Sequence, residues 1–356
     1  MSHMFIPGPV DVDQDVLEAQ AKPMIPHRSA EFDKIFRGTE AKLKKVFHTK
    51  NRVFQPPATG TGMQEAGIRN LVQKNVLSCV NGAFSERWYQ VAVTNGKQAD
   101  RLEGEWGDII TPEELADALK AKSYEAVTIV HNETSTGVEN PLKELAAVVH
   151  DVSPDTLILV DAVSSMGGVK IETDSWGVDF IFTSSQKCFA IPPGMSFAAV
   201  SDRCLERAEE VENRGWYFDL LRLEKHRIKN STPMTPSMSL IWALDVQLDK
   251  MLAEGLDNRY ARHQAMAERV QTWAVEHGME PLAPQGYRSK TVSTIKNLRG
   301  VDIPALNTFL LTKGMRLSNG YGDLKNKTFR IAHMGETKMH HIDELLEAFE
   351  SFLEKM

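Results

Sequence analysis

The stretch DFIFTSSQKCFAIPPGMSF, Asp179 to Phe197, joins a short apolar run to a lysine and a loop with two prolines and a glycine. The run from Asp179 to Thr183 is predicted to be a buried strand, because it is rich in aromatic and β-branched residues. A lysine at the end of a strand usually just extends its amine into water. The function of Lys187 must therefore be judged from the residues that the fold places around it.

Short β-rich runs alternate with amphipathic helical patterns between about residue 50 and residue 200. Several of these runs are almost continuously apolar, which is typical of strands covered on both faces of a sheet. One helix is expected to begin at Thr111-Pro112-Glu113-Glu114, a capping box with proline at the first helical position. The alternation predicts an α/β fold with a mostly parallel sheet. The expected strands are 52–55, 75–80, 126–130, 156–160, 179–183 and 196–200.

The last third of the chain has a different pattern. Two long helical patterns, 240–256 and 257–277, meet near Gly255, and a strand, helix, strand, helix sequence follows over 289–298, 303–313, 328–332 and 341–353. This part is too short to continue the first sheet's repeat, so a smaller second domain is expected. We predict an N-terminal arm (1–17), a large domain (18–257) and a small C-terminal α/β domain (258–356).

Composition excludes several classes of protein. The formal charge of −7 and pI near 5.9 argue against nucleic-acid or anionic-membrane binding, which need concentrated positive charge. No run of 18 apolar residues predicts a membrane span, and the first residues lack a signal-peptide pattern. Three scattered cysteines are too few for a disulfide framework or a zinc site. No metal site is predicted, because His333, His340 and His341 lack partners at ligand spacing. A cytoplasmic protein is expected.

Chemistry in a parallel α/β sheet is expected where strands end and loops begin. The loop 57–63, PATGTGM, follows a strand and opens a helix, so it could hold a phosphate, although a plain tight turn explains it about equally well. Asp161 ends an apolar strand, where a carboxylate needs a cation or donors. Lys187 follows 26 residues later, an interval that fits one crossover to the neighbouring strand. The hydroxyl-rich segment 131–137 ends another strand.

A phosphate loop, a buried carboxylate and an amine together suggest pyridoxal 5′-phosphate. This cofactor needs a lysine amine for a Schiff base, a carboxylate to keep its ring nitrogen protonated, and donors for its phosphate. Lys187 would hold the cofactor and later move protons at the substrate, and its pKa is expected to be lowered by partial burial and neighbouring positive charge.

At these motifs the chain resembles the fold-type I, class V aminotransferases, in the branch of alanine–glyoxylate and serine–pyruvate aminotransferases. The resemblance covers nearly the whole chain and implies a large, mostly parallel sheet of the seven-stranded type. The motifs are in family order: Pro7-Gly8-Pro9, Thr59-Gly60-Thr61-Gly62, Asn81-Gly82, His131 to Val138, Val160 to Ser165, Ser184 to Lys187 with Pro192-Pro193-Gly194, and Phe329-Arg330-Ile331.

The resemblance implies a role for individual residues. Lys187 is the Schiff-base lysine and Asp161 the partner of the ring nitrogen. Arg330 binds the substrate α-carboxylate and Gly8 offers main-chain contacts to substrate, while Phe84 stands where the family has a stacking tryptophan. The remaining cofactor ligands that it implies are Thr61, Gly62, Met63 and Gln186 for the phosphate, Thr134 for the ring hydroxyl, and Thr235 from the neighbouring subunit of a homodimer. Thr232 occupies a position where the family commonly has tyrosine.

The activity that the resemblance implies is transfer of the amino group of alanine or serine to glyoxylate or pyruvate by a ping-pong mechanism. The sequence shows no second arginine clearly placed for a distal carboxylate, which disfavours aspartate. A cysteine desulfurase is excluded, because Phe84 replaces the stacking histidine and no cysteine follows Cys204. Other fold-type I enzymes, an aspartate aminotransferase or an amino-acid lyase, remain alternatives. A nucleotide-dependent dehydrogenase lacks the required glycine pattern, and a silent binding module would be expected to have lost Lys187 or Asp161.

Overall fold

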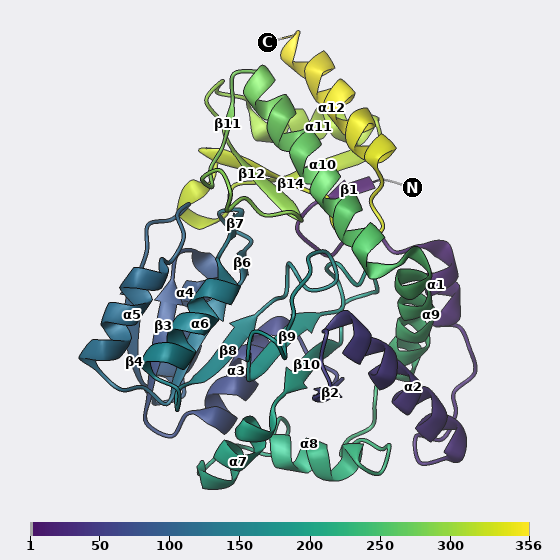
Figure 1. Ribbon diagram of the computed structural model, residues 1–356. Coiled ribbons are helices and arrows are strands. Elements are labelled where there is room, and N and C mark those ends of the chain that lie inside the picture. Colours follow the sequence, from purple (N-terminus) through teal and green to yellow (C-terminus); the bar gives the residue numbers. More distant parts are fainter. Residues whose placement is uncertain (1–2, 356) are drawn as a thin grey trace.

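The computed structural model describes residues 3–355, in which a seven-stranded and a five-stranded sheet each carry their own helices (Figure 1). In the large sheet β10 is antiparallel to both neighbours, and the other strand pairs are parallel. The expected large, mostly parallel sheet is confirmed. Its strands, in spatial order, are β2 (Arg52–Phe54), β10 (Ser196–Val200), β9 (Phe180–Ser184), β8 (Leu157–Asp161), β5 (Ala126–Val130), β3 (Asn75–Val80) and β4 (Gln98–Glu103).

Helices cover both faces of the large sheet. Alternate side chains of each strand point to opposite faces, so Ile158 and Val160 join one core while Leu157 and Leu159 join another. The first core is completed by α2 (Ala30–Val46), α5 (Pro112–Ala121), α6 (Leu142–Val152) and α9 (Met238–Glu254). The second is completed by α3 (Gly60–Leu71), α4 (Ala83–Thr94), α7 (Asp202–Glu210) and α8 (Leu220–Arg227). Burial on both faces explains the nearly continuous apolar strands.

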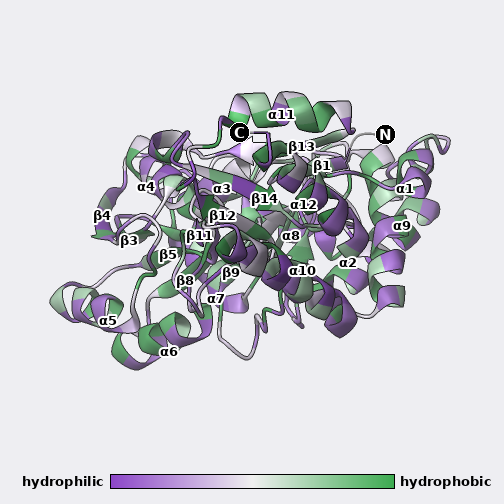
Figure 2. Ribbon diagram, turned by 90° about the horizontal axis from the view of Figure 1, so that it is seen from above, coloured by the Kyte–Doolittle hydropathy of each residue, from purple (hydrophilic) through white to green (hydrophobic). Residues whose placement is uncertain are grey.

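The small sheet contains strands from both ends of the chain. Its order is β1 (His3–Phe5), β13 (Met315–Asn319), β14 (Thr328–Ala332), β12 (Val292–Lys296) and β11 (Glu280–Pro281). Three helices enclose its core with apolar side chains: α10 (Leu256–Glu276), α11 (Ile303–Thr312) and α12 (Met339–Leu353). In Figure 2 the outer helices, such as α5 and α9, show both hydrophilic and hydrophobic residues, as expected of helices with one buried face.

Most expected elements are confirmed, with ends that differ by a few residues. The capping box at Thr111 is present, and the two long helices meet at Gly255. The sequence analysis missed β4, which has the polar sequence QADRLE and lies at the sheet edge with half of its residues exposed. Helix α1 (Gln14–Ala19) begins inside the predicted arm and ends beyond it, and His3–Phe5 of the arm form β1 in the small sheet. The domain boundaries at residues 17 and 257 stay predictions.

Two short features complete the fold near the large sheet's carboxyl edge. The hairpin strands β6 (Asn132–Glu133) and β7 (Val138–Glu139) follow β5, and the 3-10 turn η1 (Gly322–Leu324) follows β13.

Cys79, Cys188 and Cys204 are buried and form no disulfide bond with one another. Over the described range, no helix combines the length and apolar character needed to cross a membrane.

Candidate active site

The predicted carboxylate and amine lie at the same edge of the large sheet. Asp161 ends β8, and Lys187 follows the end of β9, the strand directly beside β8. Because these strands are parallel, their carboxyl ends open onto one crevice. Both side chains line a cavity of about 140 Å³, and they share it with four more of the predicted site residues: Thr61, Phe84, Thr134 and Gln186.

Asp161 is a buried carboxylate with only neutral donors. Its Oδ2 accepts a bond of 3.0 Å from Gln64 Nε2, and its Oδ1 accepts a bond of 2.9 Å from the N–H of Val163. Burial raises the pKa of Asp161 to about 6, although both hydrogen bonds act in the opposite direction. A cationic partner in the cavity would restore the ionised form. The site therefore favours a positively charged group beside Asp161.

Lys187 is 8% exposed, and its Nζ donates to the main-chain oxygen of Pro7. Burial, followed by repulsion from Arg330, lowers the pKa of Lys187 to about 8, in the expected direction. Gly8 packs against this side chain: a Cβ at Gly8 would lie 2.7 Å from Lys187 Cδ, and its φ is +89°. Glycine thus allows the N-terminal segment to approach the amine.

The glycine-rich loop opens α3 as expected. Thr59 is the N-cap, and its side chain accepts from the N–H of Gly62. A Cβ at Gly60 would lie 2.8 Å from Val163 Cγ2, so only glycine fits beside the turn that follows Asp161. Thr61 lines the cavity at the first turn of α3, where main-chain N–H groups attract anions. The Met63 side chain is instead buried in the second core of the large sheet.

Arg330 approaches the cavity from the small sheet. It is 8% exposed on β14, and its Nη1 donates to the main-chain oxygen of Thr134 at 3.3 Å. Burial lowers the pKa of Arg330 to about 10. Thr235 is exposed and does not line this chain's cavity, and Thr232 donates to the Met234 oxygen at 2.6 Å. A role for Thr235 in another subunit stays a prediction.

Glu133 is a site-forming residue that the sequence reasoning did not single out. Its carboxylate is fully buried and accepts from the main-chain N–H groups of Phe84, Ser85 and Ser135. Two of these N–H groups belong to the first turn of α4, where a negative charge is stabilised by the helix dipole. A Cβ at Gly82 would lie 2.3 Å from Glu133 Cγ. Glu133 therefore fixes the start of α4 and the position of Phe84.

Gln64, Arg87 and Asn132 also line the cavity without having been predicted. Asn132 is 2% exposed, yet neither its Oδ1 nor its Nδ2 has a partner within the described chain. The Oε1 of Gln64 is likewise buried and unpartnered. Buried amides normally form hydrogen bonds, so these atoms point to a polar ligand in the cavity. Their signal in the sequence was weak, because a single amide on a strand or helix is common.

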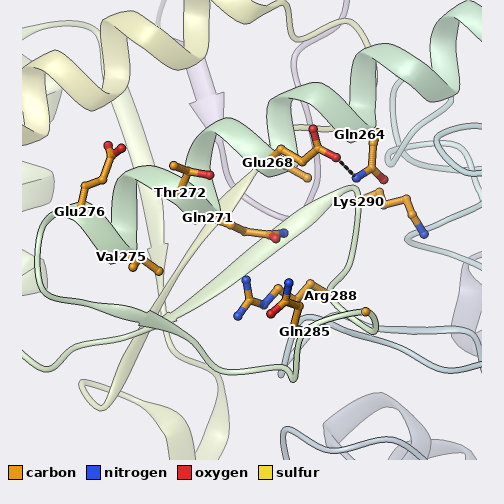
Figure 3. Close-up of a pocket in the computed structure, with 11 residues that line it drawn as sticks. Gln264, Glu268, Gln271, Thr272, Val275, Glu276, Gln285, Arg288 and Lys290 are labelled. Atoms are coloured by element: carbon orange, nitrogen blue, oxygen red, sulfur yellow. Dashed lines mark hydrogen bonds between the residues drawn. The ribbon is translucent and has the colours of Figure 1, made fainter.

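A larger cavity of about 450 Å³ lies beside α10 (Figure 3). Its lining does not combine a buried carboxylate, a buried amine and unpartnered amides. It is bounded by polar side chains of α10, including Gln264 and Glu268, and by Arg288 and Lys290 of the facing loop (Figure 3). Lys290 is already paired with Glu139. The smaller cavity is the stronger candidate, because there a buried carboxylate, a buried amine and unpartnered amides meet.

The model of the family described as aminotransferase class-V matches residues 14–322. The chain belongs to the class-V aminotransferase family. An L-aspartate–glyoxylate aminotransferase of Paracoccus denitrificans is 33% identical, over 93% of this chain and 86% of that protein. A serine–glyoxylate aminotransferase of Methylorubrum extorquens is 32% identical, over 94% and 87%.

A crystal structure of an alanine–glyoxylate aminotransferase from Nostoc sp. superimposes on this class-V aminotransferase with a TM-score of 0.93. It shares 31% identity, over 99% of this chain and 95% of that one. The fold and family expected from the motifs are thus confirmed, and the protein is an aminotransferase. Class-V aminotransferases depend on pyridoxal 5′-phosphate.

The cavity fits this cofactor. Its buried carboxylate favours a cationic ring nitrogen, its buried amine has a lowered pKa, and the unpartnered amide atoms of Asn132 and Gln64 are available to a polar ligand. Gly60 and Thr61 line the cavity at the first turn of α3, where a phosphate can accept hydrogen bonds from main-chain N–H groups.

Proposed function

We propose that Lys187 carries pyridoxal 5′-phosphate covalently and that Asp161 holds a proton on its ring nitrogen. The observation that supports this most strongly is the placement of both side chains in one cavity, at the ends of the adjacent parallel strands β8 and β9. When bound, the cofactor supplies an electron-withdrawing ring that stabilises negative charge at the substrate Cα. With a cation beside it, Asp161 is expected to stay ionised at neutral pH.

The other predicted residues are proposed to bind different parts of the cofactor. Thr61, Gly62 and Met63 at the start of α3, together with Gln186, are proposed to hold the phosphate. Thr134 is proposed to contact the ring hydroxyl, because it lines the cavity and its own hydroxyl is held 2.6 Å from that of Ser164. Phe84 is proposed to cover one face of the ring, since Glu133 fixes the start of α4 where Phe84 stands.

Substrate is proposed to bind between Arg330 and Lys187. The Arg330 guanidinium offers a fork of N–H donors that suits an α-carboxylate, and Gly8 lines the approach to the amine. A pKa near 8 leaves part of the Lys187 amine neutral at physiological pH. When it is not bound to the cofactor, its Nζ can therefore take the proton from the substrate Cα, and the ammonium group so formed can donate that proton in a later step.

We propose alanine or serine as amino donor and glyoxylate or pyruvate as acceptor, in a ping-pong reaction. The names of the serine–glyoxylate and alanine–glyoxylate relatives support this choice. A homodimer with shared active sites is also proposed, with Thr235 reaching the partner's phosphate site. Trp216, Tyr217 and Ile228 are 55%, 43% and 63% exposed on the segment before Thr235, which suits an interface. A cytoplasmic location remains the expectation.

A screen of half-reactions tests the proposal. The cofactor-loaded enzyme is mixed with single amino acids, and the conversion of the cofactor is followed by its visible absorbance. We expect alanine or serine to remove the absorbance of the lysine-bound form, and glyoxylate or pyruvate to restore it. Failure of every amino acid to change the spectrum of a loaded enzyme would refute the proposed function.

A further inference from the structure

Gln64 of α3 contacts both Asp161 and the first turn of α4. The residue is 1% exposed and lines the cavity. Its Nε2 donates to Asp161 Oδ2 at 3.0 Å and to the main-chain oxygen of Phe84 at 3.3 Å. The indole N–H of Trp88 donates in turn to the main-chain oxygen of Gln64 at 3.1 Å. Bonds to two neighbouring elements therefore hold this residue in place.

The partners of Gln64 also decide which way its amide faces. An ionised carboxylate and a main-chain oxygen only accept hydrogen bonds, so the amide nitrogen must face both of them. Both hydrogens of Nε2 are used in this way, and Oε1 is left buried without a partner in the described chain. Because a buried amide oxygen without a donor is unfavourable, Oε1 is expected to accept from a group that enters the cavity.

The position of Oε1 limits what that group can be. Oε1 and Nε2 are bonded to the same carbon, so Oε1 lies at the Asp161 end of the cavity. Phosphate oxygens accept hydrogen bonds, whereas a protonated ring nitrogen donates one. Burial raises the pKa of Asp161, and the hydrogen bond from Gln64 acts in the opposite direction, toward the ionised form. Both ends of the Gln64 amide therefore favour a cationic N–H group beside Asp161.

We propose that Gln64 is a positioning residue that helps Asp161 to keep the ring nitrogen of the cofactor protonated. Its amide nitrogen fixes Asp161 Oδ2, and its amide oxygen adds a second acceptor at the same end of the cavity. This rests on the proposed function, since it assigns the ring nitrogen to Asp161. An apolar side chain at position 64 would leave Oδ2 without its donor and the ring N–H with the carboxylate as its one acceptor.

Two forms of the cofactor separate this role from general support of the fold. The cofactor-free protein is titrated with pyridoxal 5′-phosphate and with its carbocyclic analogue, in which a C–H group replaces the ring nitrogen. Both aldehydes can form the same bond to Lys187, so the ratio of their Kd values reports on the ring nitrogen. The wild type should prefer the natural cofactor. Gln64→Met should reduce that preference by about 10- to 100-fold, the range for a lost hydrogen bond to a charged group.

Asn70→Leu is the matched control. Asn70 is a fully buried amide on the same helix, but it does not line the cavity, and its bonds go to main-chain atoms of Ala66, Phe218 and Leu220. It should leave the preference unchanged, even where it lowers stability. Gln64→Asn keeps an amide that is one methylene shorter. It should still reduce the preference, by less, and it provides the test if Gln64→Met does not fold.

Nitrogen NMR of the protein loaded with cofactor labelled at the ring nitrogen gives an independent readout. The wild type should show the shift of a protonated nitrogen, and Gln64→Met should move it toward that of a neutral one. An equal loss of affinity for both compounds, with an unchanged nitrogen shift, would overturn the inference and make Gln64 a purely structural residue. In that case a wild type that prefers the natural cofactor leaves the proposed function standing. If the wild type shows no such preference, the role proposed for Asp161 fails as well.

Discussion

Arg259 is predicted to be a main stabilising residue of the junction between the active-site loops and the small sheet. Its guanidinium is fully buried near the start of α10 and donates to the main-chain oxygens of Gly167 and Cys188 at 3.0 and 2.7 Å. It also contacts the carboxylates of Glu254 and Glu336, each at 2.8 Å. One side chain thus joins the turn after Asp161 to the loop that follows Lys187.

The pKa of Glu336 gives the magnitude. Burial would raise this pKa, but the charge and hydrogen bond of Arg259, with smaller contributions from Gln247 and Lys338, lower it from 4.5 to about 2. A shift of this size corresponds to about 3 kcal/mol of folding free energy at neutral pH. Arg259→Met should therefore lower the free energy of unfolding by about 3 kcal/mol at pH 7, close to the cost of breaking other buried ion pairs.

Urea unfolding, followed by fluorescence and circular dichroism at equal cofactor saturation, measures this loss. A carboxyl whose pKa is depressed in the folded state stabilises above its unfolded pKa, and that stabilisation is lost as the pH falls through the folded value. The difference between wild type and Arg259→Met should thus shrink by about half between pH 7 and pH 3. Arg269→Met is the control: Arg269 lies on α10, as Arg259 does, and its half-exposed pair with Asp343 of α12 should cost less than about 1 kcal/mol to remove. Equal losses for the two variants would refute the reasoning.

Three further outcomes are expected at the active site. Arg330→Ala should raise KM for every substrate with an α-carboxylate, and steady-state kinetics showing an unchanged KM would remove Arg330 from the site. Asp161→Asn keeps the shape but removes the charge, so kcat should fall by about 100-fold at equal cofactor occupancy; wild-type kcat would contradict its role. Because only the neutral amine of Lys187 can attack, the rate of cofactor attachment to cofactor-free enzyme should rise with pH and level off above about 8. A rate that still rises steeply through pH 10 would contradict a lowered pKa.

The large sheet was predictable because burial on both faces leaves an unbroken apolar signal in β5, β8 and β9. β4 was missed for the opposite reason: it lies at the sheet edge and is half exposed, so polar residues serve there equally well. β1 could not be found from local pattern, because its three residues are a strand only through pairing with Met315 to Leu317 at the far end of the chain.

Asp161 and Lys187 could also be predicted from the sequence. Asp161 ends one strongly apolar strand and Lys187 follows another, at a spacing that fits one crossover. Glu133 and Arg87 were not predictable, because their roles depend on partners that are distant in sequence, and the unpartnered amide of Asn132 shows only in the folded structure. Glu133 caps α4 from almost fifty residues away, with a separation of 48 to Ser85. Arg87 meets Tyr321 across a separation of 234 residues. Sequence reasoning found no second arginine for the cavity, and the structure places Arg87 there.

The central claim is that the amine of Lys187 carries the cofactor. Sodium borohydride reduction of the purified, cofactor-loaded protein, followed by proteolysis and mass spectrometry, tests it most directly. We predict a stable pyridoxyl modification on the peptide that contains Lys187, and loss of this modification together with the visible absorbance in Lys187→Ala. A modification on another lysine, or a loaded Lys187→Ala protein that keeps the absorbance and turnover of the wild type, would contradict the account.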